Sequence, residues 1–173
     1  MAPGSHRKPI DQAELERLGL AYAGRYATTR AKLAAYLSRK VRERGWAEAG
    51  PPQLDHLVEK FASLGYVNDG LFASGRASAL LRRGYGRRRV DQALRAAGIA
   101  EEDTADARRQ VEEGEYEAAL RYARRKHIGP FATAEIDGDA RRKAFAAMLR
   151  AGHSMDMVRK LFGTRPGDEP DGF

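Results

Sequence analysis

The sequence predicts an all-α protein, and three observations lead to this fold class. No stretch has the sustained alternation of apolar and polar residues, rich in β-branched and aromatic side chains, that is typical of strands. Apolar residues instead recur at intervals of three and four, as on one face of a helix. Glycines follow most of these stretches, where a residue in the left-handed conformation ends a helix without steric cost.

The first part of the chain is expected to contain five helices. Thr29 and Asn68 are suited to cap the second and fourth of them, and Pro51 with Pro52 fits the first turn of the third. Apolar stripes support the second, third and fifth helices: Leu33, Leu37 and Val41; Leu54, Leu57, Val58 and Phe61; Val90 and Leu94. The expected ranges are 11–26, 30–44, 52–64, 69–83 and 87–97.

Four further helices are expected after residue 100. Gly114 and Gly152 end two of them by the same rule. The remaining two have apolar stripes, formed by Tyr116, Leu120 and Ala123 and by Met155, Val158, Leu161 and Phe162. The expected ranges are 101–113, 115–127, 138–151 and 154–162.

The nine short helices are predicted to form three tandem three-helix repeats. SRKVRERGW (38–46), DQALRAAGI (91–99) and FAAMLRAGH (145–153) superimpose on their glycines, although coincidence in an all-helical chain is the alternative. Three short helices bury little apolar surface alone, so stacked repeats predict an elongated, gently curved array. The expected divisions are a disordered N-terminus (1–10), repeats at 11–66, 67–114 and 115–163, and a disordered acidic tail (164–173).

Composition limits the classes of function. The chain has 173 residues, a net charge of +7 and no cysteine. The positive charge favours a polyanionic partner or an acidic protein surface. The lack of cysteine excludes disulfides and thiolate metal sites and fits a reducing cytoplasm. No apolar run approaches the roughly 20 residues of a membrane span, and no secretory signal is visible, so no membrane association is expected.

The strongest candidate site is LLRRGYGRRRV (80–90), which places five arginines around Gly84-Tyr85-Gly86. The planar guanidinium group suits phosphate or carboxylate oxygens bidentately. If Val90 and Leu94 face the core, Arg88 and Arg95 point into solvent. The alternative is that these arginines cover a solvated face or satisfy helix carbonyls. Tyr85 can either stack on a base or fill the corner.

Two further basic patches are expected beside the middle helices of the outer repeats. One consists of Lys32, Arg39 and Arg42, opposite an apolar stripe, and the other includes Arg124, Arg125 and Lys126. Acidic residues gather instead in 101–106 and 112–117. This separation predicts a positive face, although acidic residues also compensate helix N-termini.

Catalytic patterns are missing from the sequence. The four histidines lack metal-ligand spacing, and no phosphate-binding loop or nucleophile elbow occurs. We therefore expect a binding protein without a cofactor, and not an enzyme.

One long motif resembles a known family. LGYVNDGLFA (64–73) followed by RRGYGRRRVDQALRAAGI (82–99) is similar, at fixed spacing, to the core signature of the RecX proteins, bacterial regulators of the RecA recombinase. The resemblance covers roughly residues 11 to 163 and implies tandem three-helix repeats. It also implies binding to the RecA–DNA filament in its helical groove. Such binding would modulate RecA ATPase, filament growth and strand exchange, and inhibition is the main effect that the resemblance implies.

The expected partners are therefore the RecA filament and single- and double-stranded DNA, contacted through the backbone by a monomer. The alternatives are a free-standing helix-turn-helix-like DNA-binding protein and a protein-interaction scaffold. Mostly Arg and Lys, with few amides, are expected to be exposed, which favours backbone contact over base reading. The residues expected to bind are Lys32, Arg39, Arg42, Arg76, Arg82, Arg83, Tyr85, Arg87, Arg88, Arg89, Arg95, Arg124, Arg125 and Lys126.

Overall fold

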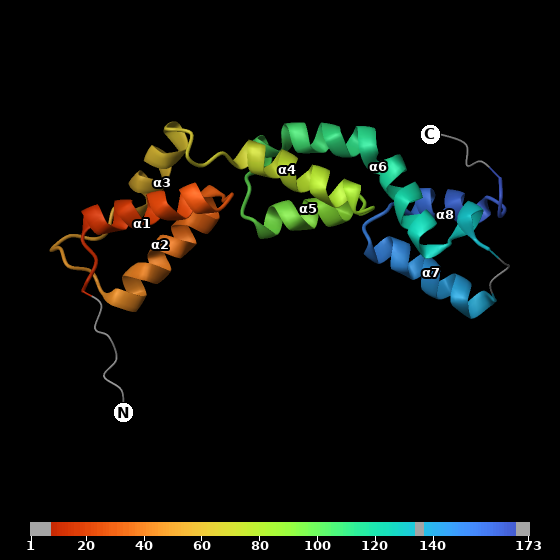
Figure 1. Ribbon diagram of the computed structural model, residues 1–173, viewed down its shortest axis with the longest axis horizontal. Coiled ribbons are helices and arrows are strands. Elements are labelled where there is room, and N and C mark those ends of the chain that lie inside the picture. The colour runs from red at the N-terminus through yellow and green to blue at the C-terminus, as the bar shows by residue number, and fades with distance from the viewer. Residues whose placement is uncertain (1–7, 134–136, 169–173) are drawn as a thin grey trace, which may run out of the picture. The chain divides into compact units, whose positions relative to one another are not determined.

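The computed structural model describes residues 8–133 and 137–168, and most of these residues lie in helices (Figure 1). Within them, the one extended pairing is an isolated bridge between Ile10 and Trp46, so the all-α prediction is confirmed. The α-helices are α1 (Gln12–Arg25), α2 (Arg30–Arg44), α3 (Leu54–Ser63), α4 (Asp69–Arg82), α5 (Arg87–Ala96), α6 (Ala105–Lys126), α7 (Gly138–Arg150) and α8 (Met155–Gly163). Two short 3₁₀ helices, Glu101–Thr104 and Gly129–Phe131, precede and follow α6.

The predicted caps form hydrogen bonds. The Thr29 hydroxyl accepts from the Lys32 backbone N–H at 3.2 Å, at the start of α2. The Asn68 side chain accepts from the Leu71 N–H at 2.8 Å, in the first turn of α4. The third helix begins at Leu54, two residues after the predicted start, with Gln53 at the N-cap position. The prediction that Pro51 and Pro52 lie in its first turn is therefore wrong, because both precede the N-cap residue.

The prediction that Gly114 ends a helix is wrong, because the expected helices 101–113 and 115–127 form the 3₁₀ turn and the single helix α6. A Cβ atom added at Gly114 would lie 3.3 Å from Leu81 Cδ1. The missing side chain therefore allows α6 to pass close to α4. Helix α6 also runs through the predicted boundary between the repeats 67–114 and 115–163.

The chain divides into two compact units. Unit 1 comprises Met1–Phe72 and Ala97–Ala100, and unit 2 comprises Ala73–Ala96 and Glu101–Phe173. Helix α4 begins in unit 1 and continues into unit 2, and the segment after α5 returns to unit 1. This division is coarser than the three expected repeats, which remain a prediction.

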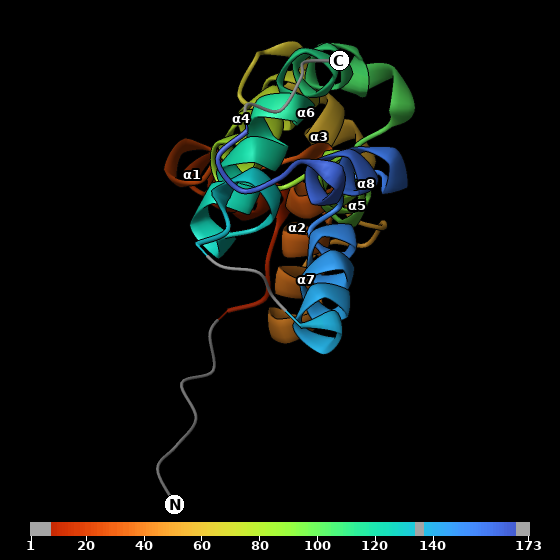
Figure 2. The ribbon, with the colours of Figure 1, turned by 90° about the vertical axis from the view of Figure 1, so that its right-hand side faces the viewer.

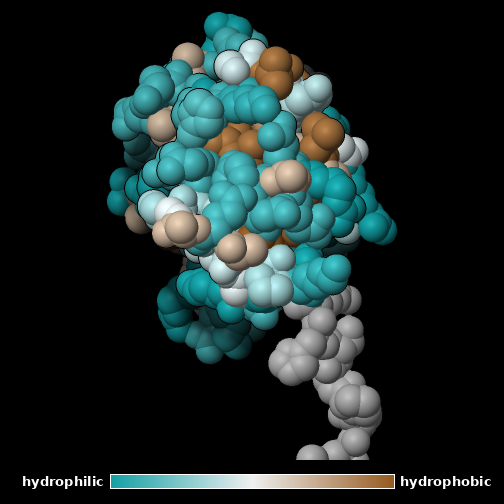
Figure 3. Space-filling model, turned by 90° about the vertical axis from the view of Figure 1, so that its left-hand side faces the viewer, coloured by the Kyte–Doolittle hydropathy of each residue, from teal (hydrophilic) through white to brown (hydrophobic). Residues whose placement is uncertain are grey.

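Unit 1 packs α1, α2 and α3 around one apolar core. The core is formed by Ile10, Leu15, Leu33, Leu37, Leu57, Val58, Phe61 and Val67. The expected disordered N-terminus (1–10) includes Ile10, which is fully buried and donates a backbone hydrogen bond to the Gly45 carbonyl. Residues 1–7 of that segment lie outside the described residues. The surface over α1–α3 in Figure 3 is mostly hydrophilic, and its hydrophobic areas are small and interrupted.

Unit 2 has its core between the C-terminal half of α6, α7 and α8 (Figure 2). Ten buried residues form it: Ala119, Tyr122, Ala123, Ile128, Met148, Ala151, Met157, Val158, Leu161 and Phe162. Part of the expected disordered tail (164–173) packs here, because the Gly167 N–H donates to the Pro130 carbonyl at 3.0 Å. Residues 169–173 lie outside the described residues. In the described part of the chain, no helix combines the length and the apolar character that crossing a membrane requires.

Candidate nucleic-acid interface

The corner Gly84-Tyr85-Gly86, which joins α4 to α5, is held by hydrogen bonds from the connection between α7 and α8. The Gly86 N–H donates to the Ala151 carbonyl at 2.9 Å, and the Arg88 N–H donates to the Gly152 carbonyl at 3.1 Å. The ring of His153 lies 3.0 Å from the Gly84 carbonyl through Nε2. These bonds fix the direction in which α5 leaves the corner.

Both glycines of the corner are required by close contact with neighbouring backbone. Gly84 has a φ of +78°, and a Cβ atom there would lie 3.0 Å from the Tyr122 nitrogen. A Cβ atom on Gly86 would lie 2.5 Å from the carbonyl carbon of Gly152. The absence of both side chains lets α6 and the α7–α8 connection pack against the corner. The arginines on either side of the corner are therefore attached to closely packed backbone.

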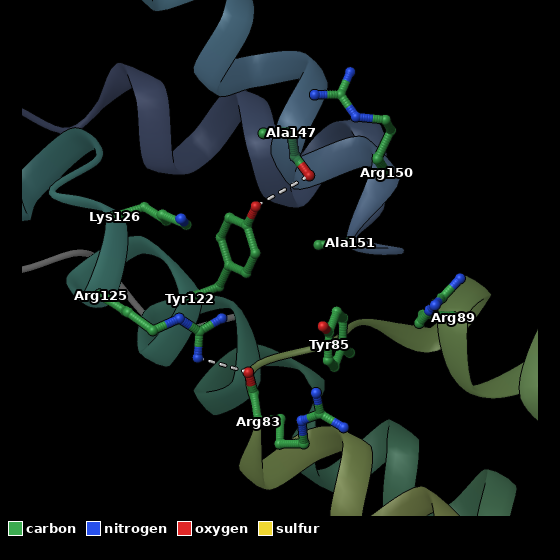
Figure 4. A pocket seen from close by; sticks show the side chains of 9 residues that line it. All are labelled: Arg83, Tyr85, Arg89, Tyr122, Arg125, Lys126, Ala147, Arg150 and Ala151. Atoms are coloured by element: carbon green, nitrogen blue, oxygen red, sulfur yellow. Dashed lines mark hydrogen bonds between the residues drawn. The ribbon is translucent and has the colours of Figure 1, made fainter.

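A pocket of about 590 Å³ opens beside this corner (Figure 4). Two aromatic rings, those of Tyr85 and Tyr122, stand among its lining side chains, and the Tyr122 hydroxyl donates to the Ala147 carbonyl at 3.3 Å. Every charged side chain in the lining is cationic. These cations are Arg83, Arg89, Arg125, Lys126 and Arg150, and they come from α5, α6, α7 and the end of α4.

A second pocket, of about 300 Å³, shares three residues with the first. Arg83, Tyr85 and Arg89 line both, while Arg76 and Gln92 line the second alone. The guanidinium carbons of Arg83 and Arg89 lie 5.3 Å and 5.9 Å from the centroid of the Tyr85 ring. Tyr85 is half-buried and packs against the core of unit 2, so it both fills the corner and lines the pockets.

The cations of this surface differ in their existing partners. The Arg125 guanidinium donates to the Arg83 carbonyl at 2.8 Å and thereby satisfies the end of α4. Arg87 forms an ion pair with Glu112 at 2.8 Å. Arg89 donates to the Gln92 side chain at 2.9 Å. Arg83 and Arg150 form no ion pair with any carboxylate in residues 8–133 or 137–168, so their charge is available to an anionic ligand.

Beneath the corner, His153 is a buried titratable group. The Tyr122 ring meets the imidazole edge-to-face at a centroid distance of 5.6 Å. Burial lowers the pKa of His153 below its usual value, and the hydrogen bond to the Gly84 carbonyl opposes this effect. Because a carbonyl only accepts hydrogen bonds, the neutral imidazole carries its proton on Nε2.

All predicted binding residues in unit 2 are exposed except the half-buried Tyr85. Arg82, Arg88 and Arg95 are exposed on α4 and α5 but do not line the two pockets. Arg124 lies with its guanidinium carbon 4.8 Å from the centroid of Phe131. Of the predicted cations, the folded unit therefore brings Arg76, Arg83, Arg89, Arg125 and Lys126 together around Tyr85.

Sequence reasoning missed Arg150 and Tyr122, which also line the first pocket. Neither belongs to the basic run at residues 82–89, and both reach the corner through the packing of α6 and α7. Arg150 carried a weak signal, as a basic residue just before Gly152 at the end of a helix.

The predicted residues of unit 1 are exposed along α2. The Lys32 ammonium lies 4.5 Å from the centroid of the Phe72 ring. Arg39 forms an ion pair with Glu43 at 3.6 Å, and Arg42 is exposed in the last turn of the helix.

The predicted acidic stretches are partly neutralised by neighbouring arginines. Arg108 pairs with Glu101 at 2.8 Å, and Arg109 pairs with Asp106 at 2.7 Å. These pairs are exposed, so each contributes little to stability. Neither arginine lines the two pockets beside the corner.

Comparison with known proteins identifies related chains. A family model described as RecX, second three-helix domain, matches residues 68–107, the segment that contains the Gly84-Tyr85-Gly86 corner. The chain is 33% identical over 176 residues to the regulatory protein RecX of Myxococcus xanthus (strain DK1622), covering 92% of this chain and 89% of that protein. It is 29% identical over 147 residues to the regulatory protein RecX of Agrobacterium fabrum (strain C58 / ATCC 33970), with 83% and 78% covered.

Solved crystal structures have a fold similar to that of this chain. A crystal structure of RecX from Lactobacillus salivarius superimposes with a TM-score of 0.65 at 17% sequence identity, covering 87% of this chain and 94% of that chain. A second crystal structure, of a regulatory protein RecX, gives a TM-score of 0.64 at 20% identity, covering 87% and 70%.

Proposed function

Because this chain belongs to the RecX family of regulatory proteins, we propose that it binds the RecA–DNA filament in the filament's helical groove and inhibits it. Binding would lower RecA ATPase, slow filament growth and block strand exchange, while ATP hydrolysis remains a reaction of RecA. We place the protein in the cytoplasm as a non-catalytic monomer. Its helices would act as three tandem repeats with a basic surface in each.

One observation carries this proposal. Around Tyr85, cations from four segments of unit 2 line two adjoining pockets whose lining contains no carboxylate. Holding like charges together costs free energy unless a polyanion is bound. Arginine forks suit phosphate oxygens, and a partly exposed tyrosine ring offers a surface for a base or sugar.

The chemistry of this surface favours the DNA backbone over individual bases. Gln92 is the sole amide among the side chains that line the two pockets, and its oxygen already accepts from Arg89. Base-specific reading relies on amides and arginines aimed into the major groove. A surface of guanidinium groups around one ring instead matches phosphates, without sequence preference. The same cations can meet acidic side chains of RecA.

The test compares two triple variants with equal changes in charge. Arg83, Arg89 and Arg150 are replaced by Ala in the pocket variant. Arg108, Arg109 and Arg159 are replaced in the control, because all three are exposed and ion-paired away from the pockets. We expect the pocket variant alone to lose inhibition of the single-stranded-DNA-dependent RecA ATPase and of strand exchange. Circular dichroism should be unchanged in both.

The decisive measurement uses the wild-type protein with RecA. If RecA ATPase and strand exchange are unaffected by an excess of the protein, the proposal is wrong. If one DNA sequence is then bound strongly without RecA, the protein is a free-standing DNA-binding protein instead. Equal loss of inhibition in the two triple variants would mean that net charge, and not the pocket, is responsible.

A further inference from the structure

Unit 1 has an aromatic pocket of its own, of about 520 Å³, between α1 and α2. Its lining combines three tyrosines, Tyr22, Tyr26 and Tyr36, with three cations, Arg25, Arg39 and Lys40. The volume is typical of small-ligand sites. This pocket lies away from the Gly84-Tyr85-Gly86 corner in the sequence, and none of its residues lines the pockets of unit 2.

The three tyrosine rings form a continuous aromatic surface. Tyr22 and Tyr36 stack with their centroids 4.1 Å apart and an angle of 12° between ring planes. Both pack on the core of unit 1, which holds the stack in place. Tyr26 extends the surface at 5.4 Å from Tyr22 with an angle of 51°. Tyr26 comes directly after the last turn of α1 and is 50% exposed.

Cations flank this aromatic surface. The guanidinium carbon of Arg25 lies 5.5 Å from the Tyr26 centroid, and Arg39 and Lys40 lie 5.7 Å and 5.8 Å from the Tyr36 centroid. Glu43 pairs with both Arg39 and Lys40, but it does not line the pocket. The lining itself therefore carries positive charge beside an exposed ring.

We propose that this pocket binds single-stranded DNA, with an unpaired base stacked on Tyr26 and the adjoining phosphate held by Arg25. Single strands carry both features that the pocket matches, flat unpaired bases and a phosphate beside each base. A duplex buries its base faces, and an acidic peptide would use the cations but not the ring. The inference extends the proposed DNA binding to a second site, in unit 1, and is tested without RecA.

The test measures affinity for two fluorescent probes, an oligothymidylate and an abasic oligonucleotide of the same length and charge. Tyr26→Ala should weaken oligothymidylate binding about tenfold, the loss typical of one stacked base. It should leave abasic binding unchanged, because that probe offers only phosphates. Tyr26→Phe keeps the ring and should bind both probes normally. Arg25→Gln should weaken binding of both probes.

Tyr66→Ala is the matched control, because Tyr66 is 52% exposed in the same unit and does not line the pocket. It should bind both probes like the wild type. Unchanged oligothymidylate affinity in Tyr26→Ala, with a normal melting temperature, would overturn the inference. If that variant bound DNA normally but lost RecA inhibition, the pocket would be a protein contact, and the proposed function would stand without this site.

Discussion

At the scale of single residues, His153 couples the basic corner to pH. Burial places its folded pKa below the unfolded value of about 6.5. The unfolded chain therefore takes up a proton first as the pH falls, and stability decreases below about pH 6.5. The contribution of neutral His153 is complete above that pH. We expect the urea midpoint to decrease from about pH 7 to pH 5.

His153→Gln provides the comparison, because an amide can still donate to the Gly84 carbonyl but does not titrate in this range. The midpoint of this variant should depend less on pH than that of the wild type. His56→Gln is the control, since His56 is exposed. Identical pH profiles for His153→Gln and the wild type would show that His153 is not the group responsible.

A second residue-scale prediction concerns Gly86. The Cβ atom of Gly86→Ala would lie 2.5 Å from the Gly152 carbonyl carbon, so the corner must move. We expect a loss of about 1–3 kcal/mol of unfolding free energy, as for overpacked sites. Gly75→Ala should instead stabilise α4 by about 0.5–1 kcal/mol, because nothing lies within 4 Å of its Cβ position. Urea denaturation measures both, and equal effects would contradict the proposed close approach.

At the scale of elements, α5 separates a buried apolar face from an exposed basic face. Val90 and Leu94 are buried, while Arg88 and Arg95 are exposed, as the helical spacing predicts. Leu94→Ala should cost about 2–5 kcal/mol of stability, because it removes buried methyl groups. Arg88→Ala should change stability by less than about 0.5 kcal/mol. Thermal unfolding compares the two, and a large loss with Arg88→Ala would assign that side chain a structural role.

Most elements could be predicted because their signals are local. The caps at Thr29 and Asn68 and the apolar stripe of α3 depend on neighbours within one or two turns. Gly114 could not be interpreted in this way. Its role depends on Leu81, a residue of another helix, so a local rule for helix ends predicted a break where the chain instead continues as α6.

At the scale of the whole molecule, the position of the basic run could be predicted from the sequence, but the residues that packing brings beside it could not. The arginine run around Tyr85 is visible in the sequence because its members are adjacent. The contributions of Tyr122 and Arg150 depend on how α6 and α7 pack onto the corner, and no local pattern marks them. Ile10 shows the same limit, because its burial depends on the bridge to Trp46.

The charge of the molecule leads to a last prediction, on salt. For duplex DNA, the slope of log affinity against log salt concentration should fall by about 0.9 for every phosphate that the protein ceases to neutralise. Replacing Arg83, Arg89 and Arg150 together should therefore reduce that slope by roughly two to three. The triple variant of Arg108, Arg109 and Arg159 should keep the wild-type slope, because ion pairs already occupy those arginines. Weaker binding with an unchanged slope would mean that the pocket cations stabilise the bound surface without touching phosphate.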